Sequence, residues 1–243
     1  MGLKLMPMRA ACKIRTLTVI AIAVSVAACV THAHKSEPIS QGPPVQTQPA
    51  SVGQAYQVIA ADSLLVIRVF RAGTLARVGH NHIVASHDLA GTVYVDKDLA
   101  RSSFELEFPV GLLTVDEAEL RAAQGADFAT DAPDAAAREG TRRNMLGPAV
   151  LDAADFPQIS LRSVGVEMQG DHLVARLEIR VRDQVHLATV PISFTLTANE
   201  LLAQGEFPLK QTDIGLQPFT ALLGALAVQD EMQLQFRLVA RVQ

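Results

Sequence analysis

The sequence predicts an all-β protein with short helices, an antiparallel barrel or sandwich of about eight strands. Three observations support this prediction. Apolar and polar residues alternate with period two along many segments, and one helical stretch near 115–147 interrupts them. The composition, 49% hydrophobic and 19% charged over 243 residues, excludes a disordered chain.

The alternation locates the individual strands. In 104–110, Phe104, Leu106 and Phe108 point to one face, and the two glutamates between them point to the other. A Gln-Gly-Asp turn at 169–171 joins two strands as a hairpin. The same pattern predicts strands at 63–70, 88–95, 159–168, 172–181, 186–197, 200–209 and 232–242.

The segment near 115–147, which interrupts the strands, is predicted to form two short helices. Segments 116–123 and 134–145 are rich in Ala, Glu and Arg and have no β-branched runs. Asp116 and Asp134 are expected to cap their N-termini, and Gly147 to end the second helix. Helices placed between strands of a barrel would lie across its mouth or rim.

The N-terminus predicts export. Residues 1–28 form a signal peptide, in which basic residues precede an uncharged apolar run at 17–28. The Val-Ala-Ala triplet before Cys29 resembles the lipobox of bacterial lipoproteins, which implies that Cys29 is acylated and becomes the first mature residue. The alternative is ordinary signal cleavage beside an incidental cysteine.

Acylation of Cys29 would anchor the mature protein to a membrane. Residues 29–54 would then be a flexible linker, because they are rich in proline and glutamine and poor in large apolar side chains. Residue 30 is valine, whereas lipoproteins kept at the inner membrane usually carry aspartate there. The resemblance therefore implies a cell-envelope location, on the periplasmic face of the outer membrane.

Charge disfavours nucleic acid as a partner. The formal net charge is -4, and without the first 15 residues the chain has 17 basic against 25 acidic residues. Such a surface would repel a phosphate backbone, and the chain has no tryptophan and two tyrosines to stack on bases. No G-x-S-x-G, H-E-x-x-H, P-loop or G-x-G-x-x-G motif occurs, so we expect neither enzymatic activity nor a required cofactor.

From residue 55 to 243 the chain resembles the polyisoprenoid-binding, YceI-like family of periplasmic proteins. The segments that carry the resemblance are YQVIAADSLLVIRV, LAGTVYVD, ELEFPVGLLTVD, DFPQISLRS and the C-terminal QTDIGLQPFTALLGALAVQDEMQLQFRLVA. The family usually has an Asp-x-x-His-Ser segment in its first strands, whereas Ser-Leu-Leu-Val follows Asp62 here. The resemblance implies a lipocalin-like barrel that holds an amphiphile with an isoprenoid or fatty-acyl tail.

A lipid-binding barrel needs an apolar interior. The apolar strand faces supply candidate ligand-binding residues, namely Phe70, Phe104, Leu106, Phe108, Leu177, Ile179, Phe194 and Phe236. The same pattern fits a filled barrel that acts as an interaction module, because periodicity does not distinguish a hollow interior from a packed one. A homodimer is one hypothesis for its assembly.

Three histidines cluster near residue 80. His80 and His82 would project to the same side of a strand, and with His87 they suit Zn or Cu. A metal-binding periplasmic protein is therefore the alternative function. The competing interpretation is a polar loop or mouth, lined by neutral histidines that hydrogen-bond to the backbone or to a ligand head group.

Overall fold

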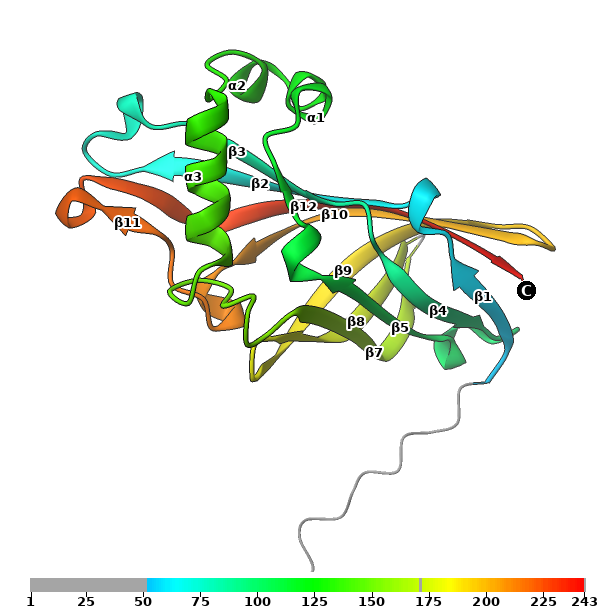
Figure 1. Cartoon of the computed structure of the whole chain (residues 1–243). Coiled ribbons are helices and arrows are strands. Elements are labelled where there is room, and N and C mark those ends of the chain that lie inside the picture. Colours follow the sequence, from blue (N-terminus) through cyan, green and yellow to red (C-terminus); the bar gives the residue numbers. More distant parts are fainter. Residues whose placement is uncertain (1–51, 171, 243) are drawn as a thin grey trace, which may run out of the picture. The chain divides into compact units, whose positions relative to one another are not determined.

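The computed structural model describes residues 52–170 and 172–242, all of which belong to the unit Gln48–Gln243 (Figure 1). The predicted signal peptide 1–28, Cys29 and the linker up to residue 51 lie outside the described residues. Among the helices of the described residues 52–170 and 172–242, none is long and apolar enough to cross a bilayer.

Twelve strands form one antiparallel sheet. Their bounds are β1 Gln54–Val58, β2 Leu64–Ala72, β3 His82–Ser86, β4 Ala90–Val95, β5 Ser103–Pro109, β6 Thr114–Val115, β7 Gln158–Gln169, β8 His172–Val181, β9 Gln184–Leu196, β10 Glu200–Lys210, β11 Thr220–Ala221 and β12 Leu226–Val242. The order β1-β4-β5-β7-β8-β9-β10-β12 closes on itself because β12 also pairs with β1. The predicted antiparallel barrel of eight strands is therefore confirmed.

Strands β2, β3 and β6 extend the barrel wall lengthwise. β1 pairs with β4 while β2 pairs with β3, and β5 pairs with β4 while β6 pairs with β3. In each of the successive pairs β1/β2, β3/β4 and β5/β6, the chain thus continues along the wall from one part to the other. The long strand β12 holds the two parts of the wall together, since it pairs with β2 along one stretch and with β1 at its end.

The register of the sheet places apolar residues of neighbouring strands opposite one another. Leu106 of β5 lies opposite Leu161 of β7, which lies opposite Ile179 of β8. Directly opposed residues share a face of the sheet, so these side chains form one inward-facing row. Strands β7 and β8 pair as the predicted hairpin, with Gln169 opposite His172.

Three α-helices separate β6 from β7: α1 Ala118–Ala123, α2 Ala126–Ala129 and α3 Ala135–Leu146. The short 3-10 helices are η1 Ala60–Asp62, η2 Ala76–Val78, η3 Leu99–Arg101, η4 Val110–Leu112, η5 Thr212–Ile214 and η6 Leu222–Gly224. As predicted, the Asp134 side chain caps α3 by accepting a hydrogen bond of 2.8 Å from the Ala137 N–H, and Gly147 ends the helix.

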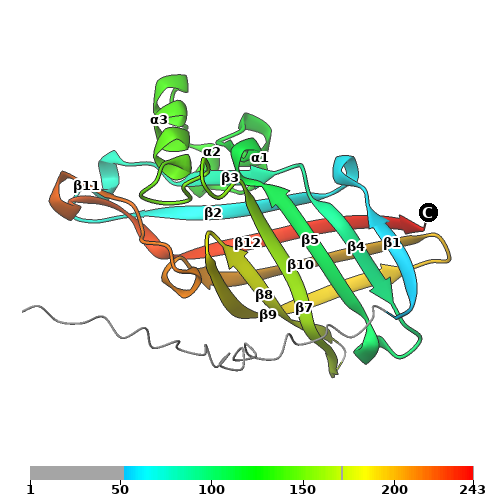
Figure 2. The same ribbon diagram turned by 60° about the horizontal axis from the view of Figure 1, so that its bottom comes forward.

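The helical segment packs on the barrel in two places. Val150 and Leu151, which follow α3, belong to the main core inside the barrel. Phe128 of α2 instead joins Val66 and Ile83 in a second cluster. Because Leu65 and Ile67 face the barrel interior, Val66 between them faces outward, so α1 and α2 cover the outer side of β2 and β3 (Figure 2).

Candidate functional site

The barrel encloses an apolar cavity of about 210 Å³. All residues that line it are apolar except Ser102 and Ser103, which lie where η3 leads into β5. A cavity of about 150 Å³ suffices for benzene, and sites for drug-sized ligands measure about 300–1,000 Å³. The interior therefore has room for a slender apolar group.

Most of the predicted ligand-binding residues line this cavity. Seven of them do so: Phe104, Leu106, Phe108, Leu177, Ile179, Phe194 and Phe236. Phe70 does not, contrary to expectation. It lies in β2 on the face opposite to Leu65 and Ile67, and its ring meets Phe128 edge-on, with 5.5 Å between the ring centroids.

Phe207 of β10 also lines the cavity and was not among the predicted residues, although it belongs to a segment whose alternation was recognised. Two residues earlier, Gly205 lies opposite Phe236 of β12. A Cβ atom at Gly205 would lie 2.5 Å from the Phe236 ring and 2.5 Å from the Pro191 carbonyl oxygen. The missing side chain at Gly205 thus leaves space for the Phe236 ring in the cavity wall.

The three histidines near residue 80 lie outside the cavity lining, so the hypothesis of a histidine-lined mouth is not supported. His82 Nδ1 lies 2.7 Å from Asp116 Oδ2, and His80 Nδ1 lies 3.1 Å from the Asp131 carbonyl oxygen. His87 is engaged elsewhere, with Nε2 at 2.9 Å from Glu117 Oε1.

This arrangement gives metal binding no support. The ring centroids of His80 and His82 are 6.4 Å apart. Throughout 52–170 and 172–242, no three His, Cys, Asp or Glu residues are arranged to hold a metal ion. Binding of Zn or Cu by His80, His82 and His87 stays a prediction.

Asp116 is not the helix N-cap that the sequence predicted. Residue Glu117 holds the N-cap position of α1, while Asp116 has a left-handed backbone (φ 56°) and is 2% exposed. Its carboxylate accepts hydrogen bonds from the Ile83 N–H at 2.9 Å and from Arg121 Nη1 at 2.5 Å, in addition to His82. An acid before a helix is the local pattern of a cap, and it does not indicate that this carboxylate is buried and has three partners.

Burial by itself raises the pKa of Asp116. The hydrogen bonds from His82, the Ile83 backbone and Arg121, together with the nearby charge of His82, outweigh burial and hold the pKa below its ordinary value of 3.8. Asp116 is therefore ionised at neutral pH and paired with the buried Arg121 guanidinium.

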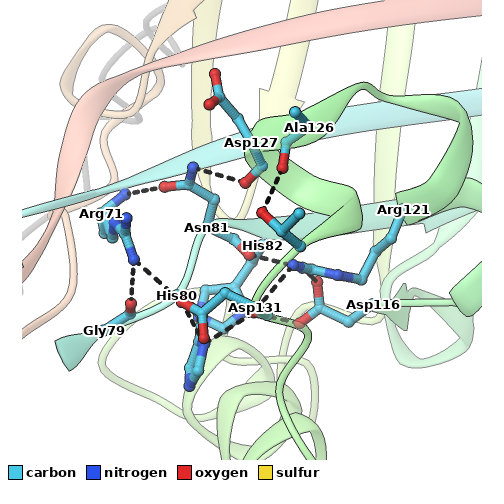
Figure 3. A network of polar contacts seen from close by, with 11 residues as sticks. Arg71, Gly79, His80, Asn81, His82, Asp116, Arg121, Ala126, Asp127 and Asp131 are labelled. Carbon is cyan, nitrogen blue, oxygen red and sulfur yellow. Dashed lines mark hydrogen bonds and ion pairs between the residues drawn. The ribbon is translucent and has the colours of Figure 1, made fainter. Parts of the chain in front are cut away.

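Further polar contacts extend from this pair to the outer loops (Figure 3). Arg121 Nη1 also donates to the Asn81 carbonyl oxygen at 2.7 Å, and the Asn81 side chain bonds to the Arg71 N–H and the Asp127 carbonyl. Arg71 in turn donates to Asp131 at 3.2 Å. The network fastens the β2–β3 connection to the helical segment, a structural role outside the cavity.

A closed eight-stranded antiparallel barrel around an apolar interior defines a lipocalin-like class of proteins. Within this class, the chain belongs to the YceI-like domain family, which matches residues 56–240. No curated protein matches the sequence significantly.

The chain is similar to several solved structures at low sequence identity. BcnA of Burkholderia cenocepacia has a TM-score of 0.54 and 17% identity over 75% of this chain and 99% of its own. A polyisoprenoid-binding domain from Saccharophagus degradans, implicated in plant cell wall breakdown, has a TM-score of 0.48 and 13% identity over 78% of this chain and 99% of its own. The YCEI protein of Campylobacter jejuni gives 0.46 and 8% identity over 64% of this chain and 82% of its own.

Proposed function

We propose that this chain binds the apolar tail of an amphiphile inside its barrel. The observation that carries the proposal is the cavity, because its lining offers a continuous apolar surface from eight strands. Transfer of hydrocarbon from water to such a surface is favourable, by about 0.8 kcal/mol for each buried methylene. Membership of the YceI-like family agrees with this role.

The cavity selects against polar ligands. A hydroxyl or amide buried in it without a hydrogen bond would cost at least about 1–3 kcal/mol. Ser102 and Ser103 are the polar residues among those that line the cavity, and they expose no polar surface to it. We therefore place the ligand's tail in the cavity, between β5, β8 and β12, and its polar head outside the lining.

The composition of the lining favours binding over catalysis. Among the described residues that line the cavity, none carries a titratable side chain. General acid–base and nucleophilic catalysis both need such groups within reach of the substrate. Asp116 and Arg121, which form an ionised pair, are not among the residues that line the cavity.

The sequence supports a cell-envelope location for this binding. The signal-like segment 1–28 and the lipobox-like triplet before Cys29 favour a lipid-anchored protein on the periplasmic face of the outer membrane. The proposed ligand is then a lipid tail of isoprenoid or acyl type. The homodimer stays an untested prediction.

Neighbouring residues of β9 provide the test. Ile192 lines the cavity, whereas Ser193 is exposed on the opposite face of the strand. Binding of fluorescent fatty-acid and isoprenoid probes should weaken at least about tenfold in Ile192→Lys, because the tail would have to lie beside a desolvated ammonium. Ser193→Lys should bind as the parent protein does.

Native mass spectrometry of the purified parent protein should also detect a co-purified lipid. The proposal fails if the parent binds no probe and carries no lipid, or if Ile192→Lys and Ser193→Lys bind equally well. In the first case the interior holds no lipid, and an interaction module becomes the better explanation.

A further inference from the structure

Two loops at one end of the molecule expose apolar side chains side by side. They are the β2–β3 connection at 73–79 and the segment 219–225, which contains β11 and η6 and leads into β12. Both lie together at one extremity of both views (Figures 1 and 2). The Leu75 N–H donates to the Ala225 carbonyl at 2.9 Å and so joins the loops. We define the apolar tip as the exposed residues Leu75, Val78, Phe219, Leu222 and Leu223.

The two leucines of η6 project furthest. Leu222 is 66% exposed and Leu223 is 110% exposed, which means that the Leu223 side chain touches almost nothing else in the protein. Burial in the core therefore does not explain why these residues are apolar. An isolated exposed leucine is ordinary on a protein surface, but five apolar side chains on two adjoining loops form a patch.

The backbone of η6 is also unfavourable for leucine. Leu222 and Leu223 have φ values of 50° and 56°, and Gly224 follows at 86°. The left-handed conformation costs roughly 1–2 kcal/mol for a residue with a Cβ, and turns that need it normally use glycine or asparagine. Neither turn geometry nor packing favours leucine here, which points to a role in binding something outside the barrel.

Charge distinguishes the two loops from the rest of the domain. Acidic residues outnumber basic ones in the whole chain, yet 73–79 and 219–225 contain no acid and one base, Arg77. Arg77 is exposed and has no ion-pair partner among the described residues. A projecting apolar group with an adjacent cation is the combination that phospholipid surfaces attract.

The size of the apolar tip argues against a protein partner. A stable protein–protein interface buries about 800 Å² on each side, contributed by roughly 20–30 residues. Five side chains on two narrow loops fall well short of that, whereas a bilayer interface accepts a few apolar side chains inserted at a single point.

We propose that the apolar tip inserts into the interfacial region of a phospholipid bilayer and holds the barrel against the membrane. Leu222 and Leu223 enter among the acyl chains, and Arg77 lies at the level of anionic head groups. This interaction is separate from acylation of Cys29 and from ligand binding in the cavity, so each of the three can be tested in the absence of the others.

The test uses the exported chain carrying Cys29→Ser, so that an acyl anchor does not mask weaker binding. Flotation with phosphatidylethanolamine–phosphatidylglycerol vesicles should recover the protein with the lipid. Leu222→Asn with Leu223→Asn should weaken partitioning by about tenfold or more, because two buried leucines are lost. Asparagine tolerates the left-handed backbone, so this variant should unfold at the same temperature or higher.

A matched control lies on the side of the barrel. Leu187 of β9 is 71% exposed and belongs to neither loop of the apolar tip, and Leu187→Asn should leave flotation unchanged. Arg77→Gln should weaken binding to vesicles that contain phosphatidylglycerol and have little effect on phosphatidylcholine vesicles. Binding of a cavity probe in detergent-free buffer should be unaffected in Leu187→Asn, in Arg77→Gln and in the double asparagine variant.

Fluorescence gives direct evidence of insertion because the chain contains no tryptophan. The emission of Leu223→Trp should shift to the blue when vesicles are added, while that of Leu187→Trp should not. The proposal is overturned if the parent does not float, if the double asparagine variant floats equally well, or if the apolar tip instead mediates self-association that those changes abolish.

Discussion

The Arg121 guanidinium donates a 2.5 Å hydrogen bond to the Asp116 carboxylate where the two residues are 3% and 2% exposed. An ion pair removed from water in this way is stable only with both partners present, since either charge alone would be desolvated. Asp116 follows β6 directly and Arg121 belongs to α1. The pair therefore fixes the point at which the chain leaves the barrel for the helical segment.

Replacing Asp116 by Asn should destabilise the protein by about 3–5 kcal/mol, because Arg121 is left as an unpaired buried charge. Asparagine keeps the side-chain shape and tolerates φ near 56°, so the substitution changes mainly the charge. Urea unfolding followed by circular dichroism measures the effect.

Adding Arg121→Met to Asp116→Asn should recover part of the lost stability, because the unpaired charge is then removed. The single variant Arg121→Met completes the comparison. If the stability lost in the double variant equals the sum of the losses in the two single variants, Asp116 and Arg121 are not coupled.

Stability should fall in acid partly through Asp116. Because its folded-state pKa lies below the ordinary value of 3.8, the carboxylate contributes stability that is fully present above that value and is lost as pH falls through the folded-state pKa. The free energy of unfolding, measured at about pH 6 and about pH 3, should decrease less in Asp116→Asn than in the parent.

Glu117, whose pKa is also lowered, should keep some acid sensitivity in Asp116→Asn. Asp134→Asn is the control, because asparagine caps a helix as aspartate does and the residue is exposed. An unchanged pH dependence in Asp116→Asn would show that the carboxylate contributes no linked stability.

Gly205→Ala should destabilise the barrel by about 1–3 kcal/mol, because a methyl group there would overlap the Phe236 ring and the Pro191 carbonyl. Displacement of the ring into the interior should also weaken binding of the lipid probe. Gly165→Ala in β7 is the matched control, since its new Cβ would meet no atom within 4 Å. Thermal unfolding that is equal in the two variants would show that Gly205 is not needed for close packing.

Cys29→Ser should release the protein from membranes into the soluble exported fraction, because it removes the acyl chains that two-signal anchoring requires. Membrane fractionation with immunoblotting measures the distribution. Partial retention that depends on Leu222 and Leu223 would reveal the contribution of the apolar tip. Complete retention in a variant that also lacks those leucines would refute the lipoprotein interpretation.

The local pattern predicted the barrel wall well where one face of a strand is polar. In β5 and β8 the alternating charges identified the inward residues, and Leu106 and Ile179 line the cavity as expected. In β2 the run Leu-Leu-Val-Ile is apolar on both faces, because one face meets the cavity and the other meets α2. Alternation does not assign a side in such a strand, and Phe70 was therefore misplaced.

Sequence separation explains why the role of Asp116 was missed. Its partners His82 and Ile83 lie more than thirty residues away, and only the pairing of β3 with β6 brings them together. An acid that precedes a helix is usually a cap, and nothing within one helical turn indicates otherwise. The apolar tip was missed for a similar reason, because its two loops become neighbours through the tertiary fold.

Closure of the barrel by β1 and β12 has a consequence for how the protein folds. Tyr56 pairs with Val242, so closure of the barrel joins two segments that are almost 190 residues apart in the sequence. Pairings this distant in sequence are slow, because the entropy of ordering the whole intervening chain is lost first. Met232, Leu234 and Phe236 reach the cavity from the same final strand. The apolar interior is thus complete only once β12 has been synthesised and has paired with β1.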